Sequence, residues 1–242
     1  INLETMRSVI EMTSFAVSRD EMKPALTGVF LRLNDSKLTA VATDGHRLVQ
    51  YINKDYKASE FTGDVIIPRK FLGLFNTFTS KETEILVSEN HLIALFGEDT
   101  VYTRVIDERF PDYESVIPVD NDKVLAINRD DLLGAVKRVS IFSNKATHQI
   151  ALHLDEKKVR ITTEDPEKAS RGQEDLSGAQ YNGDALVIGY NASYLRDILV
   201  HVQDENVIIK LKTPISATLF YPEKLNDNID LTMLLMPIRL ND

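Results

Sequence analysis

The chain repeats one pattern of apolar residues and turns along its length. Val29–Leu33 reappears as Ile150–Leu154, and Gly63–Ile67 reappears as Gly183–Val187, so a unit of about 120 residues occurs twice in tandem. A solenoid needs at least about three small repeats, so two copies predict a duplicated domain. A duplicated domain presents the same structural face at two places, which suits a surface that follows something long.

Composition limits the class of protein. The 242 residues, 43% of them hydrophobic, suffice for two domains with a core each. The chain shows no leader, and no apolar run approaches the ~20 residues of a membrane span. It has no cysteine, which excludes disulfides and thiolate chemistry and suits the cytoplasm. A net charge of −9 argues against binding nucleic acid over the whole surface.

The two copies predict the same order of elements. Each begins with a helix, over residues 1–15 and 127–142, capped by Asn2 and Asn128, whose side-chain oxygens can accept free backbone N–H groups. Second helices are expected over residues 71–78 and 194–202. Strands are expected over residues 27–33, 38–43, 65–67, 85–87, 92–96, 101–105, 150–154, 159–163, 185–188, 207–211, 217–221 and 231–236. The fold class is therefore α+β, with antiparallel sheets. A polar stretch with a proline at residues 118–122 divides the chain into domains 1–118 and 119–242.

Asp44 and His46 form the densest polar cluster and allow two interpretations. They can be a metal pair or an acid–base pair, in which case the protein would be a hydrolase. Alternatively, Asp44 and Gly45 form a turn, after which a strand begins. The second interpretation is favoured because no third ligand lies near and the second copy has no histidine there. The sequence contains none of the common motifs of nucleophilic catalysis or nucleotide binding. We therefore predict no catalytic residue, no metal site and no cofactor.

The C-terminal segment Leu234–Leu240 is apolar and contains a proline. Proline confines such a strand to the edge of a sheet or to its end. One interpretation is a final strand that closes the second core. The other is an exposed apolar groove lined by Met236, Pro237 and Ile238, because methionine suits adaptable binding surfaces. The residues alone leave both interpretations open.

Four segments along the chain resemble the bacterial sliding clamp, the beta subunit of DNA polymerase III. They are Thr43–Leu48, Ile67–Lys70, Phe110–Tyr113 and Met236–Leu240. Their order and spacing agree with the middle and last of the three clamp domains of that family, and the N-terminal domain is absent from this sequence. In the family, two chains join head to tail into a ring around duplex DNA. The resemblance implies a non-catalytic processivity factor that forms a homodimer in its full-length form.

Helices line the hole of the ring in this family, so the resemblance implies that basic side chains on the helices and one loop face DNA. Such contacts would go to phosphates without reading bases, because base-specific bonds would stop sliding. The candidates are Arg7, Arg19, Lys23, Arg69, Lys70, Lys137, Arg138 and Arg196.

The family also has a peptide-binding groove between these two domains. Linear motifs of the polymerase III catalytic subunit, the clamp loader, repair polymerases and mismatch-repair proteins dock there. Carried over by position, the groove would be lined by Leu26, Thr43, Gly45, His46, Arg47, Leu48, Pro111, Val116, Asn191, Tyr194, Ile215, Met236, Pro237, Ile238, Arg239 and Leu240.

Three departures from the family pattern affect the expected groove. Ser115 stands where some relatives have arginine, and Ala217 where some have serine. Asn241 and Asp242 extend beyond the usual terminal leucine. We expect these positions to change polar contacts at the rim of the groove and the edge of its pocket.

Overall fold

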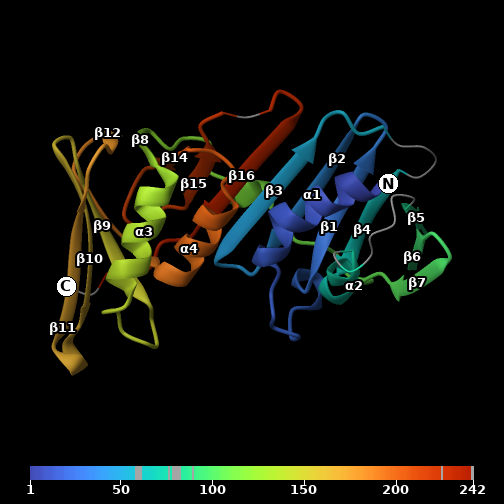
Figure 1. The fold of residues 1–242 in the computed structure, drawn as a ribbon, viewed down its shortest axis with the longest axis horizontal. Helices are drawn as coiled ribbons and strands as arrows, with labels where there is room; N and C mark the ends of the chain where they lie inside the picture. Colours follow the sequence, from blue (N-terminus) through green and yellow to red (C-terminus); the bar gives the residue numbers. More distant parts are fainter. Residues whose placement is uncertain (58–61, 76, 78–82, 89, 225, 241–242) are drawn as a thin grey trace. The chain divides into compact units, whose positions relative to one another are not determined.

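The computed structural model describes residues 1–57, 62–75, 77, 83–88, 90–224 and 226–240 (Figure 1). The chain forms two compact units. The first comprises Ile1–Asp112 and Leu225–Leu231, and the second comprises Tyr113–Lys224 and Thr232–Asp242. The sequence predicts the domain boundary between residues 118 and 119, six residues after Asp112, where the first segment of the first unit ends. That boundary stays a prediction.

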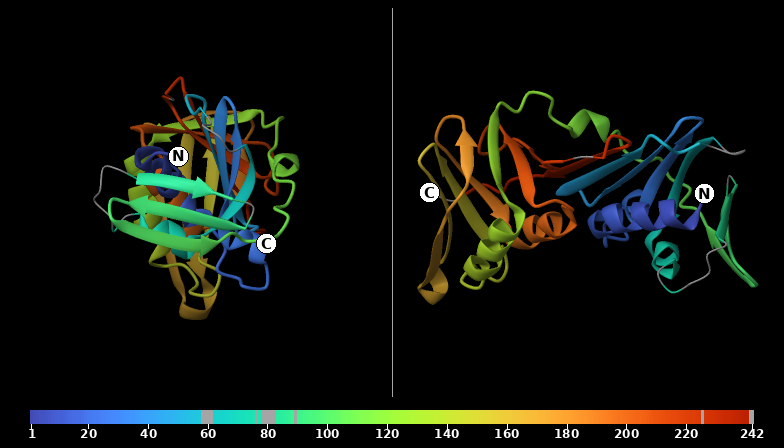
Figure 2. Two further views of the ribbon diagram at one scale, coloured as in Figure 1. Left: turned by 90° about the vertical axis from the view of Figure 1, so that its right-hand side faces the viewer. Right: turned by 45° about the horizontal axis from the view of Figure 1, so that its top comes forward.

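The first unit begins with helix α1 (Leu3–Thr13). The Asn2 side chain accepts a hydrogen bond from the Thr5 backbone N–H at 2.8 Å, so the predicted cap is confirmed. Met6, Val9 and Ile10 are buried on the face that packs on the sheet. A second helix, α2 (Arg69–Leu74), follows β4 directly in the chain (Figure 2). It ends before the predicted residue 78, which lies outside the described residues.

Two antiparallel sheets make up the rest of the first unit. Four strands are ordered β3-β2-β1-β4 and three are ordered β5-β6-β7. Their bounds are β1 (Gly28–Asn34), β2 (Lys37–Thr43), β3 (Arg47–Asn53), β4 (Gly63–Pro68), β5 (Thr83–Val87), β6 (His91–Phe96) and β7 (Asp99–Arg104). Strand β2 is buried at every position after Lys37, with α1 packed on it, so it lies at the centre of the core.

The second unit repeats this plan with helices α3 (Arg129–Ser140) and α4 (Ala192–His201), which pack against each other (Figure 1). Asn128 caps α3 by accepting the backbone N–H groups of Asp130 and Asp131, as predicted. Asn191 caps α4 in the same way, so this helix begins two residues before the predicted start at Tyr194.

The sheets of the second unit show the duplication most clearly. Four strands are ordered β13-β9-β10-β11, which matches β4-β1-β2-β3 strand for strand. The other sheet runs β12-β8-β14-β15-β16. The bounds are β8 (Lys123–Asn128), β9 (Gln149–Asp155), β10 (Lys158–Asp165), β11 (Ser170–Leu176), β12 (Gln180–Asn182), β13 (Leu186–Asn191), β14 (Asn206–Leu211), β15 (Thr218–Pro222) and β16 (Ile229–Leu235). The prediction of tandem α+β units with antiparallel sheets is confirmed.

Three strands were not predicted from the sequence, namely β8, β11 and β12, whereas β3 begins after the Asp44–Gly45 turn as the favoured interpretation predicts. Strand β11 has the sequence SRGQEDL, and only Leu176 is buried, so it carries no apolar alternation. It forms because its backbone pairs with β10 from Val159↔Leu176 to Asp165↔Ser170. Such pairing is a property of the neighbouring strand and leaves no local signal.

Candidate functional site

The segment Asp44–Arg47 forms a tight turn. The Asp44 Oδ1 atom accepts the backbone N–H groups of His46 at 2.9 Å and Arg47 at 3.0 Å, and Oδ2 accepts the Arg47 Nε–H at 3.1 Å. Gly45 has a φ of 91°, which favours glycine. Both carboxylate oxygens therefore hold the turn. Within the described residues no three His, Asp or Glu side chains are grouped to bind a metal. The hydrolase interpretation has no support.

Arg47 connects this turn to the end of the first helical segment. Its Nη2 atom donates to the Phe15 carbonyl at 2.7 Å, and its guanidinium lies 5.4 Å from the centre of the Phe15 ring. Thr43 donates its hydroxyl to the Arg47 carbonyl at 2.7 Å. Both side chains are buried, as is Leu48. These three predicted groove residues therefore hold the local structure together within their unit.

The other predicted groove residues of the first unit are more accessible. His46, Gly45 and Pro111 are exposed, and Leu26 is half-buried in a short 3-10 turn, Pro24–Leu26. The turn geometry presents His46 on the surface because Asp44 holds its backbone N–H inward. The accessible part of this set is therefore His46 with its neighbouring backbone, together with Leu26 and Pro111.

In the second unit, the C-terminal segment runs along the edge of β13. The Ile238 backbone N–H donates to the Gly189 carbonyl at 2.9 Å, and the two residues form an isolated antiparallel bridge. Met236 is 40% exposed, although Leu234 and Leu235 just before it are buried. The final strand thus closes the core, as one interpretation predicts. Met236 after it is exposed, and the groove of the other interpretation stays a prediction.

The remaining predicted groove residues of the second unit lie at three places. Asn191 and Tyr194 are at the start of α4, where the Asn191 side chain is a cap and also donates to the Thr147 carbonyl at 3.1 Å. Ile215 is 60% exposed and Val116 is 53% exposed. Pro237, Ile238 and Leu240 are half-buried and Arg239 is exposed. The exposed apolar side chains are Val116, Ile215 and Met236, which suits apolar contact with a ligand.

The departures from the family pattern have different surroundings. Ser115 is exposed in the 3-10 turn Glu114–Val116. Ala217 is half-buried, and its carbonyl accepts a hydrogen bond from Asn121 Nδ2 at 3.0 Å. Asn241 and Asp242 lie outside the described residues. Their effects on a groove stay predictions.

All the predicted DNA-facing side chains are exposed, but their charges differ in availability. Arg138 is held by Glu174 through two hydrogen bonds of 2.9 and 2.6 Å, which raise the pKa of Arg138 and lower that of Glu174. Arg196 lies 3.5 Å from Asp197.

Arg69 and Lys70 occupy the first turn of α2, and Lys137 is beside Arg138 in the last turn of α3. Lys137 is therefore a stronger candidate for a phosphate contact than Arg138.

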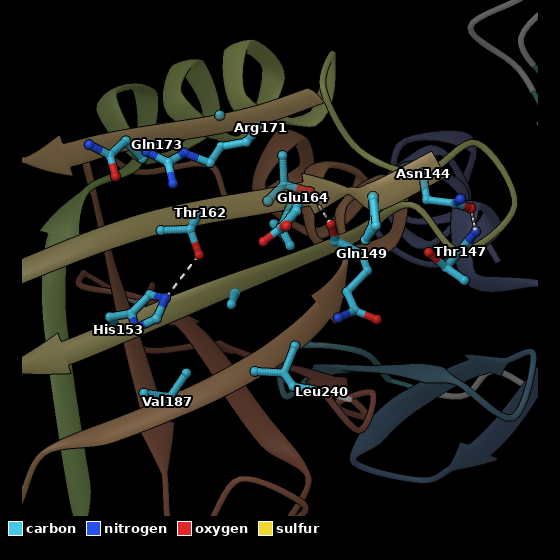
Figure 3. A pocket seen from close by; sticks show the side chains of 15 residues that line it. Asn144, Thr147, Gln149, His153, Thr162, Glu164, Arg171, Gln173, Val187 and Leu240 are labelled. Atoms are coloured by element: carbon cyan, nitrogen blue, oxygen red, sulfur yellow. Dashed lines mark hydrogen bonds between the residues drawn. The ribbon is translucent and has the colours of Figure 1, made fainter. Parts of the chain in front are cut away.

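The four-stranded sheet of the second unit carries a cavity that the sequence did not predict. It has a volume of about 700 Å³ and lies over β9, β10, β11 and β13 (Figure 3). His153 Nε2 and Thr162 Oγ1 are 2.9 Å apart on its floor, and burial, followed by the charge of Arg160, lowers the pKa of His153. Glu164 and Arg171 face each other across two strands. Leu240 is the one predicted groove residue that lines it. Cross-strand register assembles this set, so no spacing in the sequence indicates it.

A pH dependence is expected from the ion pairs of this sheet. Hydrogen bonds from Arg160 at 2.6 Å and, secondarily, from Lys158 lower the pKa of Asp175 from 3.8 to about 2. Because the folded pKa lies below the unfolded one, the stabilisation is complete above about pH 4 and is lost as the pH falls toward 2. The difference in melting temperature between wild type and Asp175→Asn should therefore shrink over that range, as measured by calorimetry. The exposed Glu156→Gln is the control, and an equal pH dependence for both variants would contradict the assignment.

Comparisons with known proteins agree with this architecture. Residues 1–112 match the family model of the DNA polymerase III beta subunit, central domain, and residues 114–239 match the model of its C-terminal domain. The beta sliding clamp of Pseudomonas aeruginosa is 35% identical over 97% of this chain and 64% of its own length. That of Pseudomonas putida is 36% identical over 99% of this chain and 65% of its own length.

Solved structures show the same likeness. A DNA polymerase sliding clamp from Pseudomonas aeruginosa superposes with a TM-score of 0.90 at 34% identity, covering 99% of this chain and 66% of that one. A sliding clamp from Bartonella birtlesii bound to griselimycin has a TM-score of 0.90 at 29% identity, covering 99% of this chain and 65% of that one.

Two consecutive α+β units that share the strand order β4-β1-β2-β3 and β13-β9-β10-β11, each matched by a clamp-domain model, define a clamp-domain protein. Within that class, the chain belongs to the family of the DNA polymerase III beta subunit, the bacterial sliding clamp. It spans slightly less than two thirds of the length of the first two curated relatives it matches, 64% and 65%.

Proposed function

We propose that this chain acts as part of a DNA sliding clamp, a ring that tethers a polymerase to duplex DNA without catalysing a reaction. The observation that carries the proposal is the match of both consecutive domains of the beta subunit along the chain. The commitment of Asp44 to a turn agrees with a non-catalytic role. The place of action would be the cytoplasm. Among the described residues, no helix has the length and apolar character of a membrane span.

The DNA contact we propose is electrostatic and independent of sequence. With a net charge of −9, the protein can hold DNA only where its cations gather. Arg69 and Lys70 on α2, Lys137 on α3, and Arg19 and Lys23 in the loop after α1 are exposed cations suited to phosphate oxygens. Phosphate contacts without base contacts allow the protein to move along the duplex.

We propose that the full-length protein forms a head-to-tail homodimer. Within the described residues, β11 pairs only with β10, so one edge of this strand is open. Ile141 and Phe142 are exposed apolar side chains after α3, and Phe142 lies beside Gly172 of β11. An open strand edge next to exposed apolar residues supports a contact with another chain.

The client partners we propose are the polymerase III catalytic subunit, the clamp loader, repair polymerases and mismatch-repair proteins, each binding through a linear motif. The exposed apolar residues Val116, Ile215 and Met236 of the second unit support such a binding site. Pockets of this kind combine apolar walls with a few polar groups.

Met236→Ala tests the proposed function. If Met236 is a wall of the groove, the substitution should weaken binding of a short peptide rich in glutamine and leucine by ~1 kcal/mol or more, about fivefold. Isothermal titration calorimetry measures this change. Met22→Ala is the matched control, because Met22 is 88% exposed and lies outside the predicted groove. Equal peptide affinity for wild type and Met236→Ala would remove the groove assignment.

A further inference from the structure

The C-terminal segment of the second unit depends on one position of β13. After β16 ends at Leu235, Pro237 has no N–H to donate, so the regular ladder cannot continue through it. The next residue, Ile238, donates its N–H to the Gly189 carbonyl at 2.9 Å. This single bridge extends the sheet beyond β13 by a short segment.

Gly189 makes room for that segment. A Cβ atom at this position would lie 2.6 Å from the Ile238 carbonyl oxygen and 2.6 Å from Leu240 Cδ2. Contacts below 3.0 Å are not tolerated, so the backbone of the segment would have to move. The residue opposite Gly189 on β9 is Ala151, another small residue, and Ala151 and Leu240 line the same cavity (Figure 3). Leu240 thus packs beside Gly189 of β13, which pairs with the small residue Ala151 of β9. We call the space above these two small residues the notch.

We propose that Gly189 is a positioning residue that holds residues 236–240 in place as a wall of the peptide groove, an inference that rests on the proposed function. Gly189 is buried and acts through Ile238 and Leu240. Upstream, Leu235 is held in β16 by its pairing with Thr218. Met236 and Pro237 therefore lie between two paired residues, Leu235 and Ile238, so their position depends on the bridge as well as on the strand.

The experiment measures the segment and the peptide separately. In Gly189→Ala, the Ile238 amide should exchange with solvent at least about tenfold faster, because the added methyl displaces the segment. Affinity for the glutamine-and-leucine-rich peptide should fall at least about fivefold, the scale of a residue important for binding. Gly73→Ala is the matched control, since nothing lies within 4 Å of a Cβ placed there.

Leu240→Ala provides a second route if Gly189→Ala fails to fold. It empties the notch without altering β13, and should also speed exchange at Ile238 and weaken the peptide. When both variants fold, the affinity lost by their double mutant should be smaller than the sum of the two single losses, because both variants disturb the packing of Leu240 on Gly189.

The outcomes separate the inference from the proposed function. If the wild-type protein does not bind the peptide, the proposed function is contradicted. The proposed role of residues 236–240 as a wall of the peptide groove is then contradicted as well. Normal binding by wild type and weaker binding by Met236→Ala, with no change in exchange or affinity for Gly189→Ala, overturns the inference alone. Fully additive losses in the double mutant also overturn it.

Discussion

Phe75→Ala is expected to lower the free energy of unfolding of the first unit by about 3–5 kcal/mol, the usual cost of removing a buried phenylalanine. The Phe75 side chain is fully buried. Its ring packs edge-on against Phe71 with centroids 5.4 Å apart and against Phe96 at 5.3 Å. Phe71 belongs to α2 and Phe96 to β6, so the substitution leaves a cavity where the helix and the smaller sheet meet.

Urea unfolding followed by circular dichroism measures this effect. Because two units can unfold separately, the transition is fitted for each unit. Tyr102→Ala is the control, since Tyr102 is 68% exposed on β7 and should change stability by about 0.5 kcal/mol or less. A loss below about 1 kcal/mol for Phe75→Ala would mean that this part of the core rearranges to fill the space.

Arg47→Ala is expected to cost about 3 kcal/mol, the lower part of the range for breaking a buried ion pair. The side chains of Arg47 and Asp44 are only 9% and 13% exposed. Removing the guanidinium leaves Asp44 Oδ2 and the Phe15 carbonyl without these donors. Asp44 Oδ1 keeps two backbone N–H donors, which places the expected cost at the lower end.

Arg47→Lys distinguishes geometry from charge. Lysine keeps the positive charge, but it lacks the planar guanidinium that contacts Asp44 and Phe15 at the same time. We therefore expect a loss of stability between those of wild type and Arg47→Ala. The exposed neighbour His46→Ala should cost less than Arg47→Ala, as measured by urea unfolding. If Arg47 lined a groove without supporting the turn, Arg47→Ala would weaken peptide binding and leave stability unchanged.

The predicted elements with local causes agree with the structure. Asn2 and Asn128 cap their helices because a short side chain reaches the first free N–H groups of its own helix. The repeat is seen as two runs of four paired strands in the same order, β4-β1-β2-β3 and β13-β9-β10-β11. Family membership followed from four spaced segments, and the family models confirm it.

The predictions that depended on distant partners were less complete. The sequence favours a turn over a metal pair at Asp44 and His46, and the hydrogen bonds to Asp44 agree with the turn. The sequence predicts Arg138 as a cation that faces DNA, and in the structure Glu174 of β11 pairs with it. A strand as polar as β11 has no signal of its own, so neither the strand nor the pairing of Arg138 was predictable.

The sequence by itself determines the helix caps, the apolar periodicity and the tandem repeat. Caps and periodicity depend on residues a few positions apart, and the repeat is a similarity between two segments of the chain. The cross-strand cavity, the engagement of Arg138 and the bridge between Gly189 and Ile238 join residues tens of positions apart. Strand register brings such residues together, and register depends on which strands pair and where each pairing begins. That information exists only in the folded chain.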